Sequence, residues 1–218
     1  MKITSNTFEV LKSFTSINPS IYINTGNVVK TISPQKTIIA RAEVDESFDV
    51  PFGIYDLNQF LGVISIFETP DFVFDEKMCT ISEEKHPMAQ SYTYADPNMI
   101  MQAPDKDLEL PDVVVEFELK DEVFKKTVQA ASVLQLPNWS VIGDKKNVTI
   151  VVNNSKDTSS NAFRHVVGTT DLEFDLVFKV ENLKFMSNDY TVRVSSKGIS
   201  HFSSEKGKLQ YFIATESR

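Results

Sequence analysis

The sequence contains a single cysteine, Cys79, and only seven glycines among its 218 residues. One cysteine excludes an internal disulfide and fits a reducing compartment. The few glycines form no phosphate-cradling loop, which argues against a nucleotide-binding motif. No apolar run reaches the roughly 18 residues that a membrane-spanning helix needs, and the opening residues lack the apolar core of a signal peptide. We therefore expect a globular protein that stays in the cytoplasm and does not contact a membrane.

Basic residues are also scarce. The chain has 22 lysines and arginines against 30 aspartates and glutamates, which gives a formal net charge of −8. Nucleic-acid binding needs lysine and arginine to contact phosphates, so an evenly spread acidic surface would exclude it. The exclusion fails if the lysines gather on one face, because an acidic protein can carry a local basic surface.

The residues of a catalytic centre are missing as well. The three histidines, His86, His165 and His201, have no partner at metal-ligand spacing and no nucleophile at a recognisable position. The acidic clusters fall in predicted loops, where solvated acids are the ordinary interpretation. We therefore predict no catalytic residue, no metal and no cofactor. An enzyme whose site is not legible in the sequence is the alternative.

One stretch, Ile54 to Phe67 (IYDLNQFLGVISIF), organises the first half of the chain. It begins as a strand and continues, after Asp56 as N-cap, into a helix. The apolar residues recur at helical spacing and cover one face, while the opposite face is small, polar and neutral. The apolar positions are Leu57, Phe60, Leu61, Ile64 and Phe67, and the neutral ones include Asn58 and Ser65.

The rest of the chain indicates an internal repeat. The first half opens with a predicted helix over Thr4–Ile17 and continues through a β-meander. Residues 97–112 contain three prolines and several acids, which is typical of an extended linker. The pattern then restarts, with a strand at Val113–Leu119 and a helix from about Glu122 to Leu134 capped by Asp121.

The second half also repeats the strand-to-helix feature. The segment FKVENLKFM, Phe178–Met186, predicts a strand followed by a short helix with Asn182 as cap. An internal repeat of this length indicates two similar α+β domains, which we place at residues 1–108, with the linker from about 97, and at residues 109–218.

The stretch IYDLNQFLGVISIF, with VLKSFTSIN at residues 10–18 and ADP at residues 95–97, resembles the sliding clamps of T-even-type bacteriophages. These clamps are processivity factors of the replicative DNA polymerase. The resemblance follows the element order of the whole chain and is strongest up to Phe67. It implies a DNA-clamp fold: two similar domains per subunit, each with antiparallel sheets and two helices lining a ring, and three subunits in the closed ring. It also implies the cytoplasm of the host cell as the location.

The resemblance gives the lysines a role. Lys12, Lys125 and Lys126 fall on the polar faces of predicted helices, which in a ring would face the hole and double-stranded DNA. Lys184 falls on the predicted short helix at Asn182–Met186, and Lys2 and Lys120 lie near the starts of the other two helices. Lysine contacts to phosphates, without base contacts, would hold DNA non-specifically and topologically. An ordinary solvated helix face is the alternative for each of these residues.

The resemblance also implies an outer pocket for the C-terminal peptide of the polymerase and contacts with a clamp loader. Its expected place is beside the linker and the last strand. The candidate residues are Leu108, Leu110, Pro111, Tyr211, Phe212 and Ile213. Because a strand alternates its faces, either Tyr211 and Ile213 or Phe212 alone can face such a pocket. Plain core residues are the alternative.

The sequence therefore predicts a homotrimeric DNA sliding clamp without catalytic activity. The second hypothesis is a structural β-rich protein, such as a phage tail or baseplate component. The mass of the protein in solution separates the two.

Overall fold

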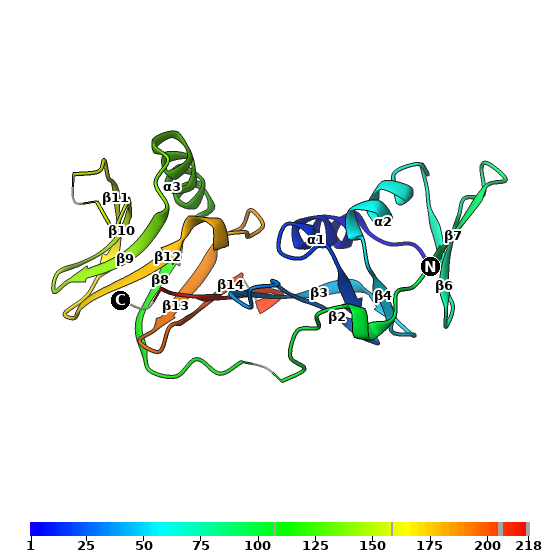
Figure 1. Ribbon diagram of the computed structural model, residues 1–218, viewed down its shortest axis with the longest axis horizontal. Helices are drawn as coiled ribbons and strands as arrows, with labels where there is room; N and C mark the ends of the chain where they lie inside the picture. The colour runs from blue at the N-terminus through cyan, green and yellow to red at the C-terminus, as the bar shows by residue number, and fades with distance from the viewer. Residues whose placement is uncertain (107, 158, 205–206, 217–218) are drawn as a thin grey trace. The chain divides into compact units, whose positions relative to one another are not determined.

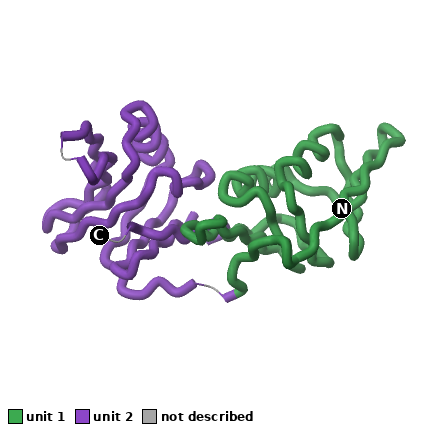
Figure 2. The backbone as a smooth tube through the Cα atoms, in the orientation of Figure 1, with its two compact units in different colours: residues 1–105 green, residues 106–218 purple. Residues whose placement is uncertain are grey.

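The computed structural model describes residues 1–106, 108–157, 159–204 and 207–216. The chain separates into two compact units, unit 1 (residues 1–105) and unit 2 (residues 106–218), shown in Figure 2. None of the helices in the described ranges has both the length and the apolar character needed to cross a bilayer.

Unit 1 contains two α-helices and three antiparallel strand groups (Figure 1). Strand β1 pairs with β4, β2 pairs with β3, and β5, β6 and β7 form a three-stranded sheet. The elements are α1 (Ser5–Thr15), β1 (Ile21–Ile23), β2 (Gly26–Ile32), β3 (Ile38–Phe48), β4 (Phe52–Ile54), α2 (Leu57–Ile64), β5 (Asp71–Phe74), β6 (Met78–Ser82), β7 (Ala89–Thr93) and the 3₁₀ turn η1 (Pro97–Met99).

The helices of unit 1 lie side by side over its core (Figure 1). Helix α1 buries Val10, Leu11 and Phe14, and α2 buries Leu57, Phe60 and Ile64. These are the spacings of one helical face, so the period of 3.6 residues that predicts the helices also sets the buried side. The predicted opening helix is confirmed, although it ends at Thr15.

Strand β6 carries the lone cysteine on its buried face. Cys79 is fully buried, and burial raises the pKa of its thiol to about 12. A thiol of this kind is protonated and shielded at neutral pH, so it is a core residue and not a nucleophile.

The described residues of unit 2 form one α-helix and two four-stranded antiparallel groups (Figure 1). The first has the order β11-β10-β9-β12 and the second has the order β15-β14-β13-β8. The elements are β8 (Val113–Leu119), α3 (Asp121–Leu134), β9 (Asn138–Asp144), β10 (Asn147–Asn153), β11 (Phe163–Thr169), β12 (Glu173–Lys179), the 3₁₀ turn η2 (Val180–Asn182), β13 (Tyr190–Ser195), β14 (Ile199–Ser204) and β15 (Leu209–Ala214).

Helix α3 packs on β9, β10 and β11, and Trp139 of β9 contacts the helix at Thr127. The Trp139 side chain is fully buried, and its Nε1–H donates to Thr127 Oγ1 at 3.0 Å. The Thr127 hydroxyl in turn donates to the Phe124 carbonyl at 2.8 Å. The indole is therefore buried with its polar atom satisfied, as a buried tryptophan requires.

The predicted helix from Asn182 to Met186 is wrong. The structure has only the single turn η2, and Leu183 leaves the helical region at φ −84° and ψ 62°. The half-buried Phe185 packs against other aromatic rings instead, with ring centroids 4.5 Å from Phe124 and 4.7 Å from Phe202. A helix this short forms too few hydrogen bonds to offset its nucleation, so burial of Phe185 decides the local chain path. The antiparallel two-domain architecture is confirmed, but the described part of unit 2 has one α-helix where the prediction had two.

Candidate functional site

The first candidate lysines belong to unit 1. Lys12 is exposed on α1, opposite the buried face of that helix, and Lys2 is exposed ahead of its first turn. The position of Lys12 is therefore set by burial of the other face. Lys184, in contrast, lies in unit 2 on the irregular segment after η2, where it is exposed but no helix orients it.

The start of α1 is held by two independent contacts. The Thr4 hydroxyl accepts a hydrogen bond from the Thr7 N–H at 3.3 Å, so Thr4 is the N-cap. Glu46 of β3, only 8% exposed, accepts from the Thr4 N–H and from the Thr7 hydroxyl. A buried carboxylate at this place satisfies helix donors that would otherwise lack partners and favours the positive end of the helix dipole.

Helix α2 contributes a neutral surface beside α1. Its cap, Asp56, accepts from the Gln59 N–H at 2.9 Å, as the sequence predicts. Asn58 and Ser65 are exposed, and the helix contains no lysine. A pocket of about 530 Å³ lies between α1 and α2, with Lys12 among its lining residues.

In unit 2, α3 presents the largest group of candidate lysines. Its buried face is formed by Phe124, Thr127 and Ala131. Lys125 and Lys126 are exposed on the opposite side, and Lys120 is exposed at the position that precedes the helix. Neither Lys12 nor Lys126 forms an ion pair with an acidic side chain in the part of the chain that the structure describes.

The first turn of α3 carries an acid–lysine network that the sequence does not reveal. Lys120 Nζ lies 2.9 Å from Asp189 Oδ2, and Lys125 Nζ lies 2.5 Å from Asp121 Oδ2. The Asp121 N–H donates to Asp189 Oδ1 at 2.9 Å, and Ser187 Oγ donates to Asp121 Oδ1 at 2.8 Å. Asp121 is therefore the first helical residue and not the predicted cap; Asp189, 68 residues later, accepts the helix N–H.

The hydrogen bonds of this network shift the ionisation of its members. The bond from Lys125 lowers the pKa of Asp121, and the bond from the Asp121 N–H lowers the pKa of Asp189. The bond that Lys120 donates to Asp189 raises the pKa of Lys120. Each shift favours the charged form, so the ion pairs persist through neutral pH.

The candidate peptide-pocket residues of the last strand do not share one surface. Tyr211 and Ile213 are fully buried in the core of unit 2, where the Tyr211 hydroxyl accepts from the Met186 N–H at 3.1 Å. Phe212 points to the other face, is half-buried, and stacks on His201 with ring centroids 4.5 Å apart. Of the three, only Phe212 keeps accessible surface for a partner.

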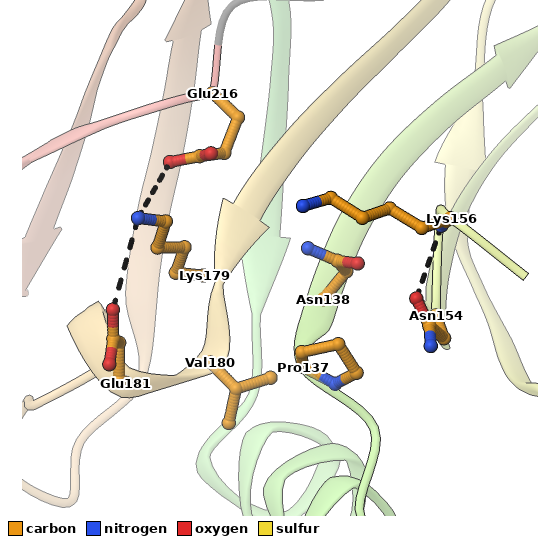
Figure 3. A pocket seen from close by; sticks show the side chains of 8 residues that line it. All are labelled: Pro137, Asn138, Asn154, Lys156, Lys179, Val180, Glu181 and Glu216. Carbon is orange, nitrogen blue, oxygen red and sulfur yellow. Dashed lines mark hydrogen bonds and ion pairs between the residues drawn. The ribbon is translucent and has the colours of Figure 1, made fainter.

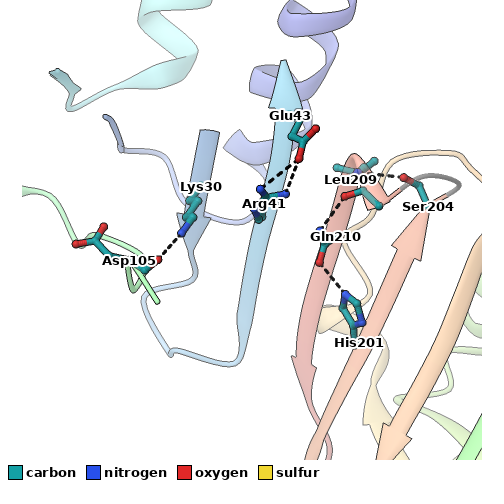
Figure 4. A network of polar contacts seen from close by, with 9 residues as sticks. Lys30, Arg41, Glu43, Asp105, His201, Ser204, Leu209 and Gln210 are labelled. Carbon is teal, nitrogen blue, oxygen red and sulfur yellow. Dashed lines mark hydrogen bonds and ion pairs between the residues drawn. The ribbon is translucent and has the colours of Figure 1, made fainter. Parts of the chain in front are cut away.

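His201 is held in place beside Phe212. Its Nε2 lies 2.9 Å from Gln210 Oε1, as Figure 4 shows. Burial lowers the pKa of the imidazole, with the nearby Arg193 charge acting in the same direction. The ring is therefore neutral at neutral pH, and it stacks on Phe212 on the half-buried face of β14 and β15.

The linker supplies the other candidate pocket residues. Leu108 and Leu110 are half-buried and Pro111 is exposed. The Ser195 hydroxyl donates to the Pro111 carbonyl, which fastens the end of the linker to β13. In unit 1, Lys30 Nζ donates to the Asp105 carbonyl at 2.9 Å (Figure 4), which holds the other end.

A second pocket lies at the ends of β9, β10 and β12 in unit 2 (Figure 3). Its volume is about 510 Å³. Lys179 stands 3.6 Å from Glu216 and 4.0 Å from Glu181 at its wall, and Lys156 reaches toward it. The charges are balanced, and the described residues include no cluster of three or more metal-ligating side chains.

Two sheet edges are further features that sequence reasoning missed. Strand β7 lies at one end of its sheet, is largely exposed and contains no charged residue. Strand β11 lies at the end of the first sheet of unit 2 and exposes Arg164, His165 and Val166. Open edges offer unpaired backbone N–H and C=O groups to another chain, and natural proteins usually protect them with charge.

Comparison with known proteins assigns both halves of the chain. The model of the DNA polymerase processivity factor family matches residues 4–100, and the model of the gp45 sliding clamp C-terminal domain matches residues 116–217. A sliding clamp of Vibrio phage KVP40 is 31% identical over the full length of both chains. That of Enterobacteria phage T4 is 27% identical over 100% of this chain and 97% of the relative.

Solved structures show the same fold at low identity. PCNA from Thermococcus kodakaraensis superposes with a TM-score of 0.71 at 14% identity, covering 98% of this chain and 97% of that one. A. fulgidus PCNA, solved with the C-terminal region of FEN-1 bound, gives 0.69 at 16% identity over 96% and 94% of the two chains. These matches give no support to a tail or baseplate component.

Proposed function

This chain belongs to the sliding clamp family of DNA polymerase processivity factors, and we propose that three copies close into a ring around duplex DNA. The ring tethers the replicative polymerase and so confers processivity. The observation that carries the DNA-facing part is the placement of Lys12 on α1 and of Lys125 and Lys126 on α3. Each lies on the exposed side of a helix whose other face is buried in its own unit.

A ring reconciles these lysines with the net charge of −8. Lysines that face the hole contact phosphates, while acids dominate the outside and discourage DNA from binding there. Because the link is topological, high affinity is not needed. Flexible side chains that touch phosphates without base contacts define no preferred register, so the ring can slide. Lys2, Lys120 and Lys184 belong to the same proposed lining.

The two open sheet edges support a ring of identical subunits. Pairing of β7 from one copy with β11 from the next would join different surfaces of the same chain, and repetition of such a contact generates a ring when the rotation closes. The charge-free β7 suits this use, because an edge that never pairs is normally protected by lysine, proline or a bulge. The chain shows no such charge along β7.

We place the peptide site for the polymerase C-terminus at the outer face of unit 2. Phe212 and the linker residues Leu108, Leu110 and Pro111 form the accessible part. Tyr211 and Ile213 support it from the core side. The clamp loader would bind the same ring, and the division between the two functional domains lies within the linker, near residue 108. The protein has no catalytic activity of its own and works in the cytoplasm of the host cell.

The DNA-facing assignment is tested by charge reversal. The triple variant Lys12→Glu, Lys125→Glu and Lys126→Glu should shorten polymerase runs at moderate salt while trimer mass and polymerase-peptide binding stay unchanged. The matched control reverses the exposed Lys36, Lys77 and Lys208, which lie off these helices and off the linker, with the same change in net charge. Equal run lengths in the two triple variants would reject the assignment.

The ring itself is tested by mass in solution. Sedimentation at micromolar concentration should give a closed trimer. A monomer, or a polymer without defined size, would overturn the proposal.

A further inference from the structure

Two of the lysines at the start of α3 are already occupied by carboxylates of their own unit. Lys120 pairs with Asp189 and Lys125 pairs with Asp121, at 2.9 Å and 2.5 Å. Both acids are themselves held, Asp189 by the Asp121 N–H and Asp121 by Ser187. The acids are therefore positioned next to the lysines before any DNA arrives, and do not meet them by chance.

Both ion pairs are exposed to solvent, so each lysine can exchange its carboxylate partner for another anion. The side chains of Lys120 and Asp189 are 57% and 50% exposed, and those of Lys125 and Asp121 are 62% and 29% exposed. Exposed ion pairs are weak and screened by salt. A DNA phosphate that approaches α3 can therefore replace either carboxylate, and the carboxylate can take its lysine back when the phosphate moves away.

Lys12 and Lys126 of the proposed lining differ from Lys120 and Lys125 in this respect. Among the described residues, no acid forms an ion pair with Lys12 or Lys126. The proposed DNA face thus has two kinds of lysine, one available at once and one that must leave an internal partner.

We propose that Asp121 and Asp189 limit the grip of α3 on DNA by competing with phosphate for Lys125 and Lys120. The inference rests on the proposed function, because it requires α3 to face the duplex. In this arrangement each lysine pairs alternately with its carboxylate and with a DNA phosphate. As the ring moves along DNA, one ion pair replaces another, so each lysine always has an anionic partner. Asp121 and Asp189 are positioning residues that act through the lysines.

The test neutralises the acids in the full-length protein. The variant Asp121→Asn with Asp189→Asn should bind a fluorescently labelled linear duplex several-fold more tightly at low salt. The plot of log affinity against log salt should steepen by about 0.9 for each additional phosphate that a lysine neutralises. Loaded on end-blocked DNA, the variant should also diffuse more slowly along the duplex, which a purely structural role would not cause.

The matched control is Glu116→Gln with Glu173→Gln. These acids pair with Arg193 and Lys145 at 2.7 Å and 2.8 Å, in exposed positions away from α3. The control raises net charge equally and frees two basic side chains. A double Asp variant with the affinity, salt slope and diffusion of the control would overturn the inference.

Two further variants keep the result decisive. If the double variant loses its folded transition, Asp121→Asn alone tests the Lys125 half, because asparagine can still accept from Ser187. The pair Lys12→Glu and Lys126→Glu removes lysines that have no ion-paired acid among the described residues. If that pair weakens DNA binding while the Asp variants match their control, only the inference fails. If it also changes nothing, the DNA-facing assignment fails first.

Discussion

The helices that carry the proposed DNA-facing lysines begin differently in the two units. Helix α1 begins at a threonine cap and a nearly buried glutamate, Glu46, supplied by β3. Helix α3 begins without a side-chain cap, and an exposed aspartate, Asp189, accepts its first N–H. Both solutions satisfy helix donors. The buried Glu46 fixes the start of α1, whereas the exposed Asp189 can exchange its partners. Of these two helix starts, the one of α3 is therefore the one that can respond to an anion from outside the protein.

The units also differ at their second helix position. In unit 1 this is α2, eight residues with a complete buried face. In unit 2 it is the single turn η2, because Phe185 is drawn into an aromatic cluster with Phe124, Phe202 and Tyr211. One regular lysine-bearing helix in each unit therefore carries most of the proposed DNA contact. Variants that weaken one unit and spare the other can separate their contributions.

The largest effect is expected in the core of unit 2. Trp139→Ala should lower the free energy of unfolding by about 3–5 kcal/mol, because it leaves a large cavity under α3. Urea denaturation followed by circular dichroism measures the loss. Trp139→Phe keeps the contact with Phe178, whose ring lies 5.5 Å away, and should lose less. Equal losses in the two variants would show that the aromatic packing is not what stabilises this unit.

The next effect distinguishes the two helix starts. Glu46→Ala should cost unit 1 about 1–3 kcal/mol, since the buried Thr7 hydroxyl and the Thr4 N–H lose their acceptor. Trp139 is the sole tryptophan, so its fluorescence follows unit 2 while circular dichroism follows both units. The dichroism transition should shift and the fluorescence transition should stay. Asp189→Ala should shift the fluorescence transition, and the part of the dichroism transition that belongs to unit 2. This shift should be smaller, because water replaces an exposed partner.

A smaller effect comes from the cap of α1. Thr4→Ala should lower the stability of unit 1 by about 1 kcal/mol, the usual value for a lost N-cap. The same dichroism transition reports it. Thr4→Ser keeps the hydroxyl that accepts from Thr7, so it should behave like the wild type; a serine variant as unstable as the alanine one would contradict the capping role.

The smallest effect depends on pH and belongs to unit 2. Burial lowers the pKa of His201 in the folded state, so the unfolded chain binds the proton more readily. The stability gained from the neutral, buried imidazole is fully present above the ordinary histidine pKa of about 6.5. It is lost as pH falls through the lower pKa that His201 has in the folded state. The midpoint of the fluorescence transition should therefore move to lower urea concentration as pH falls below about 6.5. His201→Gln should remove that part of the pH dependence, and an unchanged profile would refute it.

The parts of the fold that the sequence predicts are those with periodic burial. Helices α1 and α2 follow from apolar residues at helical spacing, and α3 follows in the same way from Phe124 to Leu134. The prediction of a helix at Asn182–Met186 is wrong because five residues are too few to establish a helical period. The packing of Phe185 therefore decides the path of the chain there. Alternation along β15 correctly separates Phe212 from Tyr211 and Ile213, but only the structure shows which side is buried.

The site is less predictable because its parts are distant in the chain. Lys120 and Asp189 are 69 residues apart in the chain. The sequence around Asp189 does not indicate that its carboxylate accepts a hydrogen bond from the first N–H of α3. Lys125 and Asp121 have the spacing of a helical ion pair, but that pair becomes visible only when the start of the helix is placed at Asp121. The lysine positions are predictable; their partners are not.

The burial of Cys79 has a practical consequence for measuring this protein. The thiol is shielded and protonated near neutral pH, so maleimide and iodoacetamide reagents, which attack accessible thiolates, should spare it in the native state. A fluorophore can then be attached at a single introduced surface cysteine, for example at Glu173, without first removing the native one. Stoichiometric labelling of the variant, and none of the parent, would provide a dye-carrying protein suited to single-molecule tracking on DNA.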